Sequence, residues 1–74
     1  MHITIKLFAS FRSGRFDIET REFPEGTTVG DVADHLALPR AELGIMMINS
    51  RHVKHDHVIE NGVTLALFPL LGGG

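Results

Sequence analysis

The sequence predicts an α+β domain in two layers: a mixed sheet of about four to five strands with one main helix packed on one face. Three observations support this fold class. Two segments near the N-terminus alternate polar and apolar residues, as half-buried strands do. One segment in the middle has helical periodicity, and mostly apolar segments follow it. At 74 residues, the chain has room for a single core.

The first two predicted strands form a hairpin. In segment 2–7, the apolar residues Ile3, Ile5 and Leu7 alternate with polar residues and therefore share one face. A second alternating run covers residues 16–23 and ends at a proline. A Ser-Gly pair between the two runs provides turn residues, so we expect a hairpin with a long, irregular connection.

A helix is predicted next, beginning after Thr28. Four apolar residues recur with the spacing of one helix face: Val29, Val32, Ala33 and Leu36. The Thr28 hydroxyl is placed to accept a backbone N–H of the first turn, and Asp31 supplies the reciprocal half of a capping box. Pro39 disfavours helical angles at the residue before it, so the predicted helix has about ten residues.

Further strands are predicted after the helix. The unbroken apolar run 45–49 indicates a strand covered on both faces, and Val53 indicates a brief strand after the next turn. Asn61-Gly62 is a strong turn signal. The run 63–68 that follows is apolar at nearly every position, which suits a central place in the sheet. Pro69 ends it, because proline has no N–H to donate.

Composition excludes several classes of protein. The formal net charge of −2 gives no electrostatic footprint for nucleic acid. The absence of cysteine excludes disulfides, thiolate metal sites and a cysteine nucleophile. No apolar run approaches the roughly 20 residues that span a bilayer, and no secretory signal is recognisable at the start. We therefore expect a cytoplasmic protein that binds neither nucleic acid nor membrane.

Three histidines lie close together in the sequence: His52, His55 and His57. Imidazoles at such spacings can hold zinc or copper. No further ligand spacing supports a metal here, and Lys54 and Asp56 between the histidines favour the solvated rim of a turn. We expect no metal site.

Residues 69–74 form a predicted extended tail beyond a domain of residues 1–68. Fully extended, the tail reaches roughly 20 Å, and glycine is the residue that passes through a channel too narrow for a Cβ atom. The chemical group at its tip is the α-carboxylate of Gly74. This group is ionised at neutral pH and unreactive, so another enzyme must activate it, for example as an acyl adenylate. A terminus that is simply disordered is the alternative.

Apolar residues precede the terminal glycines. We interpret Phe68, Pro69, Leu70 and Leu71 as a partner-docking patch, because an exposed apolar cluster beside a working tail marks an interface. The alternative places Phe68 in the core and leaves only the two leucines protruding.

Four segments carry a resemblance to a known family: Ile3-Thr4-Ile5-Lys6-Leu7-Phe8-Ala9, Thr28-Val29-Gly30-Asp31-Val32, Ile48-Asn49-Ser50-Arg51 and Asn61–Pro69. They are followed by Gly72, Gly73 and Gly74 at the end. Over its whole length the chain resembles the ubiquitin-like β-grasp sulfur carriers, in particular the MoaD-like small subunit of molybdopterin synthase, with the ThiS-like thiamine sulfur carriers as relatives. The Phe-Pro pair before the tail is more specific to the molybdopterin branch, whereas a terminal Gly-Gly is shared by all branches and by protein modifiers.

The resemblance implies a ubiquitin-like β-grasp fold and a mechanism at the terminus. A partner E1-like adenylating enzyme uses ATP to activate the Gly74 carboxylate, and sulfur from a persulfide donor system replaces the adenylate to leave a thiocarboxylate. Docked into a large molybdopterin synthase subunit, this group donates sulfur to a pterin precursor of the molybdenum or tungsten cofactor. By this resemblance the chain binds no cofactor and is not an enzyme on its own.

Three other functions stay open. The same chemistry serves a sulfur carrier for thiamine or another sulfur-containing product. A ubiquitin-like protein modifier would form isopeptide bonds between Gly74 and target lysines. A β-grasp interaction module would carry an inert tail.

Overall fold

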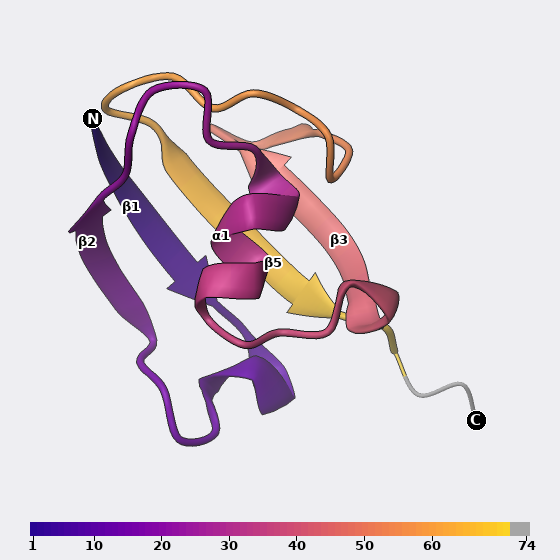
Figure 1. The fold of residues 1–74 in the computed structure, drawn as a ribbon. Coiled ribbons are helices and arrows are strands. Elements are labelled where there is room, and N and C mark those ends of the chain that lie inside the picture. The colour runs from indigo at the N-terminus through magenta and orange to yellow at the C-terminus, as the bar shows by residue number, and fades with distance from the viewer. Residues whose placement is uncertain (72–74) are drawn as a thin grey trace.

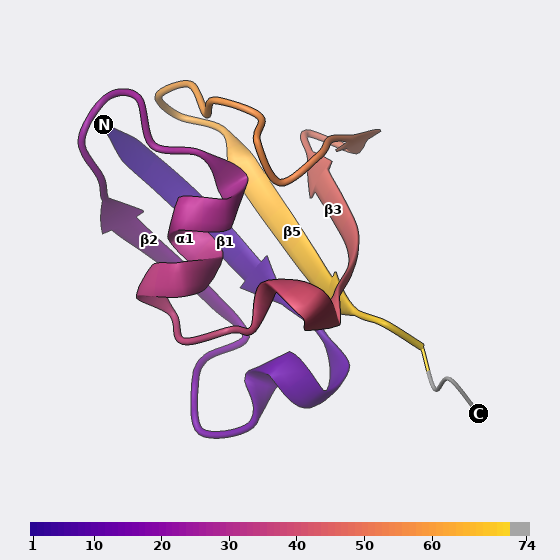
Figure 2. The ribbon, with the colours of Figure 1, turned by 45° about the vertical axis from the view of Figure 1, so that its right-hand side comes forward.

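The fold, taken from a computed structural model that describes residues 1–71, is the predicted two-layer α+β domain. One face of a five-stranded mixed sheet is covered by an α-helix (Figures 1 and 2). In chain order the elements are β1 (His2–Leu7), the 3-10 helix η1 (Ala9–Arg12), β2 (Ile18–Glu22), α1 (Val29–His35), the 3-10 helix η2 (Arg40–Glu42), β3 (Leu43–Ile48), β4 (Arg51–His52) and β5 (Thr64–Pro69).

The strands lie in the order β2-β1-β5-β3-β4. β1 and β5 pair in parallel, and the other neighbours are antiparallel. The predicted hairpin of the first two strands and the central place of the last strand are therefore confirmed. A hairpin, a crossing helix and a last strand inserted beside the first make up the ubiquitin-like β-grasp fold.

The core lies between α1 and the face of the sheet that α1 covers. The side chains with no exposed surface come from β1, β5 and α1: Ile3, Ile5, Leu7, Leu65, Leu67, Val29, Val32 and Ala33. The alternation predicted for β1 and the apolar face predicted for the helix are thus confirmed. This core fixes β5 in place, and β5 leads into the tail.

α1 has seven residues instead of the predicted ten or so, because hydrogen bonds at residues 36–38 end the helix before Pro39 is reached. Ala37 adopts the left-handed conformation, with φ at +57°. Its N–H donates to the Asp34 carbonyl at 3.0 Å, and the Leu38 N–H donates to the Ala33 carbonyl at 2.8 Å. This pair of bonds is the Schellman motif, which satisfies the last carbonyls of a helix. No helix among residues 1–71 has the length and apolar character needed to cross a membrane.

Replacing Ala37 by glycine is expected to raise the free energy of unfolding by about 0.5–1 kcal/mol, because glycine adopts positive φ without strain on a Cβ. Urea denaturation followed by circular dichroism measures the change. The control Ala33→Gly makes the same substitution inside the helix and should lower stability by more than about 1 kcal/mol, because the core also loses a buried methyl group. A loss of stability in Ala37→Gly would contradict this description of the helix end.

The predicted capping box is present at the start of α1. The Asp31 N–H donates to the Thr28 hydroxyl at 3.1 Å, and the Asp31 carboxylate accepts the Thr28 N–H at 3.0 Å. The backbone bond to Thr28 is the main cause that lowers the pKa of Asp31. Hydrogen bonds from the Arg40 guanidinium likewise lower the pKa of Asp34.

Stability is expected to fall in acid as these carboxylates are protonated. Their pKa values are lower in the folded chain than in the unfolded one, so their contribution is complete above the unfolded value and is lost as the pH falls through the folded value. Asp31→Asn keeps an oxygen that can accept the Thr28 N–H but does not titrate. Urea denaturation should therefore show a smaller loss of stability in Asp31→Asn between about pH 5 and about pH 2. Equal losses in both proteins would contradict the role of Asp31.

The strand predicted over 45–49 is present as β3, but the prediction that it is covered on both faces is wrong. Met46 and Ile48 pack against the core. Ile45, on the other face, is 39% exposed, and Met47 is half-buried. The cause is that α1 covers one face of the sheet only (Figure 2). Val53, predicted as a strand residue, directly follows the two-residue strand β4 and donates its N–H to the Met46 carbonyl at 2.9 Å.

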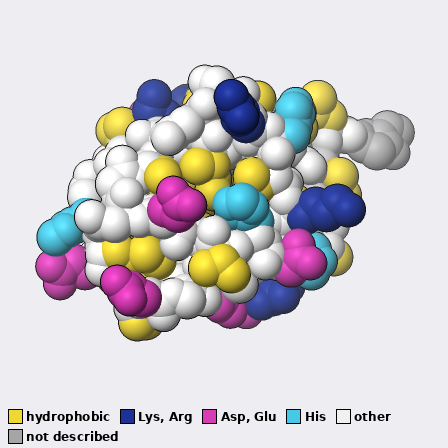
Figure 3. Space-filling model, turned by 90° about the horizontal axis from the view of Figure 1, so that it is seen from above, with side chains coloured by type: hydrophobic (Ala, Val, Ile, Leu, Met, Phe, Trp, Pro, Cys, Tyr) yellow, Lys and Arg dark blue, Asp and Glu magenta, His cyan; other side chains and the backbone are white. Residues whose placement is uncertain are grey.

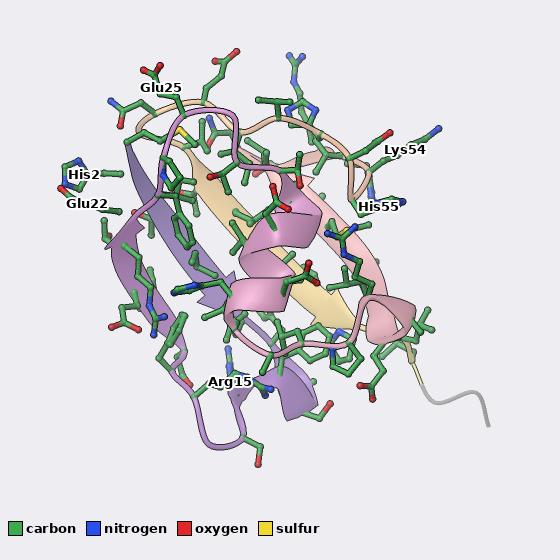
Figure 4. All side chains as sticks on the ribbon, viewed as in Figure 1. His2, Arg15, Glu22, Glu25, Lys54 and His55 are labelled. Carbon is green, nitrogen blue, oxygen red and sulfur yellow. The ribbon has the colours of Figure 1, made fainter. Side chains whose placement is uncertain are left out.

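Arg15 holds the long connection between β1 and β2 against the end of α1. Its guanidinium donates to the carbonyl oxygens of Leu36 at 3.0 Å and Ala37 at 3.1 Å, and to the Phe11 carbonyl at 3.3 Å. Figure 4 shows Arg15 close to the last turn of the helix. This side chain therefore ties the irregular connection predicted from the sequence to the end of the helix.

Candidate functional site

The described part of the predicted site lies where β5 ends. Pro69 is the last residue of β5 and pairs with Leu43 of β3. The Leu70 N–H still donates to the Glu42 carbonyl at 2.9 Å, but the Leu70 side chain is 62% exposed and that of Leu71 is 85% exposed. Three predicted tail residues lie outside the described part of the chain: Gly72, Gly73 and Gly74.

Phe68 lies on the uncovered face of the sheet. Successive residues of a strand point to opposite faces, so Phe68 points away from the buried Leu67. Its ring stacks on Phe8, with 4.1 Å between the centroids and 11° between the planes. The Arg12 guanidinium lies 5.3 Å from the centroid of the Phe8 ring. Phe68 is half-buried, and the alternative that places it in the core is therefore wrong.

The face of the sheet opposite α1, called the open face below, changes from apolar to polar along its length. The strand register aligns its side chains in rows across the sheet. From the end of β5 toward the start of β5, the rows are Phe8, Phe68 and Ile45; then Ile18, Lys6, Ala66 and Met47; then Thr20, Thr4 and Thr64; and finally Glu22 and His2. Apolar surface is therefore concentrated beside the point where the tail begins.

The polar side chains at the other end of the open face contact one another. The hydroxyls of Thr4 and Thr20 lie 2.9 Å apart. His2 Nε2 lies 2.9 Å from a carboxylate oxygen of Glu22, and Figure 4 shows the two side chains side by side at the edge of the sheet. These polar side chains already contact partners within the chain. This end therefore offers little apolar surface to which another protein could bind.

Two hollows meet at Phe68. The hollow at the root of the tail has a volume of about 260 Å³ and is lined by apolar residues: Ala9, Gly44, Ile45, Phe68, Pro69, Leu70 and Leu71. The second lies on the open face, where Phe8 and Met47 form its apolar side and Lys6 its charged side. An apolar surface of this shape beside two exposed leucines is typical of a protein interface.

A third hollow lies at the other end of the sheet, where β5 begins. The residues that line it include the apolar Ile48, Val53 and Val63 and the polar Arg51 and His57. Because β5 runs away from this hollow toward the tail, the third hollow has no part in a site built around the terminus.

The clustered histidines are not gathered as metal ligands. His52 belongs to β4, whereas His55 and His57 lie in the next loop, where their backbone carbonyls accept the N–H groups of Gly30 at 2.7 Å and Val29 at 3.1 Å. Within residues 1–71, no three His, Cys, Asp or Glu side chains are placed to hold a metal ion. Figure 3 shows histidine side chains lying apart on this end of the molecule, and Figure 4 shows His55 and Lys54 pointing outward. The loop serves to cap the start of α1.

Four residues beside the predicted patch were not predicted as parts of the site. Phe8, Ile45 and Met47 lie on the open face. The sequence could have indicated them, because side chains two residues apart along a strand point to the same face. Gly44 lines the hollow at the root of the tail. Nothing in the sequence identifies Gly44, since its importance depends on which strand lies beside it.

Comparisons with known proteins agree with this geometry. A family model described as "ThiS family" matches residues 5–74. No curated protein matches the chain. A candidate molybdopterin converting factor, subunit 1, from Pyrococcus furiosus is 27% identical with a TM-score of 0.73, and the match covers 93% of this chain and 97% of that chain. The small archaeal modifier protein 1 of Haloferax volcanii is 26% identical with a TM-score of 0.73, over 92% of this chain and 95% of that one.

A more distant likeness concerns a complex. The structure of subunits 1 and 2 of the molybdopterin-converting factor from Helicobacter pylori 26695 contains a chain with 12% identity and a TM-score of 0.66, matched over 100% of both chains. At this identity the likeness shows the shared fold alone.

Proposed function

The chain belongs to the ThiS family, and from this premise we propose that it is a cytoplasmic sulfur carrier that acts as the small subunit of a molybdopterin synthase. Its working group is the carboxylate of Gly74, which partner proteins convert to a thiocarboxylate. The chain itself supplies a docking surface and a tail of defined length, and the partners supply the catalytic residues and ATP.

The observation that carries the proposal is the concentration of apolar surface at the end of β5. Phe8, Phe68 and Ile45 lie on the open face there, and the exposed Leu70 and Leu71 continue the surface into the tail. A carrier must be held by its partner close to the tail, because each residue between the docking surface and the reacting carbon adds freedom that lowers the rate. An inert tail gives no reason for an apolar surface at this position.

The chemistry at Gly74 has three steps in the proposal. A carboxylate oxygen attacks the α-phosphorus of ATP in the partner enzyme, which releases pyrophosphate and leaves an acyl adenylate. The outer sulfur of a persulfide then attacks the carbonyl carbon, and AMP leaves. A second thiol then attacks the partner's sulfur in the resulting acyl disulfide, forms a new disulfide with it and releases the chain as a thiocarboxylate, which is a better nucleophile than the carboxylate.

The sulfur then goes to a pterin precursor bound in a large synthase subunit. The similarity to subunit 1 proteins of molybdopterin converting factors supports this partner, as does the fold shared with a chain from a complex of subunits 1 and 2. The hollow at the root of the tail would receive apolar side chains of the large subunit, and the same hollow would serve the adenylating enzyme at an earlier stage.

A second candidate is a ubiquitin-like protein modifier, favoured by the similarity to a small archaeal modifier protein. The first step, adenylation of Gly74, would be the same. The acyl group would then pass to a lysine of a target protein, so the two functions differ in the nucleophile. Sulfur carriers for thiamine or other products form a third branch with the same terminus.

Reconstitution tests the proposal. The untagged chain is mixed with ATP and an E1-like adenylating enzyme from the same host, then with a persulfide-forming desulfurase and cysteine. We expect ATP-dependent release of pyrophosphate, followed by a C-terminal thiocarboxylate that converts a pterin precursor when the large subunit is added. Absence of pyrophosphate release would overturn the carrier and modifier functions together. A thiocarboxylate that restores thiamine synthesis and not molybdopterin synthesis would move the chain to the thiamine branch.

A further inference from the structure

The start of the tail makes an unusually close contact with β3. At Gly44, a Cβ atom built on the backbone would lie 2.6 Å from the Pro69 carbonyl oxygen, 2.8 Å from the Pro69 carbonyl carbon and 2.9 Å from the Leu70 nitrogen. All three atoms belong to one peptide group, the last that joins β5 to the tail. Only a residue without a side chain leaves room for this peptide at its present position.

Position 44 requires glycine because there is no room for a side chain, and not because the backbone has a positive φ. Gly14, Gly26 and Gly62 have positive φ, whereas Gly44 does not, so other residues could adopt its conformation. The pairing of β3 with β5 shifts register between Leu43 and Ile45, on either side of Gly44. The irregularity brings the backbones of the two strands together where the tail leaves the sheet.

The same peptide group is held by a hydrogen bond. Its N–H, that of Leu70, donates to the Glu42 carbonyl at 2.9 Å. A methyl group at Gly44 would meet backbone atoms, which cannot turn aside as the end of a side chain can. The peptide would have to move away from β3, and the hydrogen bond to Glu42 would be lost.

We propose that Gly44 is a positioning residue: its missing side chain lets the Pro69–Leu70 peptide seat on β3 and so fixes the point and direction in which the tail leaves the domain. This inference rests on the proposed function. From Leu70, four more residues span at most about 14 Å, so a shift at the root changes how far the reacting carbon can reach. A misplacement of about 1 Å at a reacting centre can cost about 10²-fold in rate.

The test uses Gly44→Ala in the full chain with ATP and the E1-like adenylating enzyme of the same host. We expect kcat for pyrophosphate release to fall by at least about tenfold, with KM within about threefold of the wild-type value, because Phe8, Phe68 and Ile45 of the open face keep their places. Hydrogen exchange followed by NMR should show the Leu70 amide protected in the wild-type chain and unprotected in Gly44→Ala. A purely structural role would not separate kcat from KM.

Two control variants make the same Gly→Ala change elsewhere. At Gly30 the added methyl group meets the movable guanidinium of Arg40 instead of backbone. At Gly62 it meets no atom within 4 Å, but φ of +83° strains the alanine and should lower stability. Both variants should keep the wild-type kcat, so the loss in Gly44→Ala cannot come from stability alone.

Leu70→Pro provides a second route if Gly44→Ala does not fold. Proline removes the N–H that donates to Glu42 and leaves β3 and the core unchanged. It should lower kcat well below that of Leu70→Ala, which also loses the leucine side chain of the docking patch but keeps the N–H that donates to Glu42. If the wild-type chain is adenylated and either folded variant retains the wild-type kcat, the positioning role is overturned and the proposed function stands. If the wild-type chain is not adenylated, the proposed function is overturned and the positioning role is overturned with it.

Discussion

Removal of Gly74 is expected to lower kcat for adenylation by at least about 10²-fold, with little change in KM. The shortened chain ends in a carboxylate that stops about 3.5 Å short, because one extended residue spans that length. Docking is unaffected, since the apolar part of the open face and the exposed Leu70 and Leu71 are still present. ATP-dependent release of pyrophosphate in the presence of the adenylating enzyme measures both constants.

Tags at the two ends of the chain provide the control. A short peptide added after Gly74 turns the terminal carboxylate into an amide and should abolish adenylation. The same peptide added before Met1 should have little effect, because the Met1 nitrogen keeps an N–H for the Phe23 carbonyl, which it meets at 2.8 Å. The N-terminus also lies at the opposite end of the sheet from the end of β5 (Figure 1). Full activity with an untrimmed C-terminal tag would contradict the role of Gly74.

Phe68→Asp is expected to weaken binding to the adenylating enzyme and to the large subunit by at least about 100-fold. A carboxylate buried in an apolar interface without a partner costs several kcal/mol, and about 2.7 kcal/mol corresponds to 100-fold. Loss of the stacking with Phe8 should lower the free energy of unfolding by only about 1 kcal/mol, since the two rings lie outside the core. Titration calorimetry measures the dissociation constant, and urea denaturation measures the stability.

Ile18→Asp is the matched control for this variant. Ile18 lies on the open face as Phe68 does, in the row with Lys6, but at the edge strand β2 and 57% exposed. The same charge added there should change the dissociation constant by less than about threefold, because rim positions contribute little to binding. Equal losses of binding in the two variants would show that the open face as a whole, and not its apolar end, contacts the partners.

Much of the fold could be predicted because its signals are local. The alternation around Ile5 and the Thr28–Asp31 capping box depend on residues within a few positions of each other, and both are found as expected. The end of α1 was placed too late, because the left-handed conformation of Ala37 is stabilised by hydrogen bonds that form only in the folded chain. The single-sided cover of β3 was missed because an apolar run looks the same whether it faces a core or a docking surface.

Part of the candidate site could likewise be predicted from the sequence, and part could not. The terminal glycines and Leu70–Leu71 stand out in the sequence because no core needs them. The stacking of Phe8 on Phe68 joins residues that are distant in the chain and depends on the parallel pairing of β1 with β5. The need for glycine at position 44 also depends on a contact between distant segments, because the atoms that exclude a side chain belong to β5 and the tail. Contacts between distant segments are what a sequence pattern alone does not specify.

The intact mass of the untagged chain, purified from its native host, shows whether Gly74 carries sulfur in the cell. We expect a population in which one oxygen is replaced by sulfur, with fragmentation placing the sulfur at Gly74. A chain that carries only the carboxylate in cells that make its partner proteins, and that is recovered in part joined to lysines of other proteins, would contradict it.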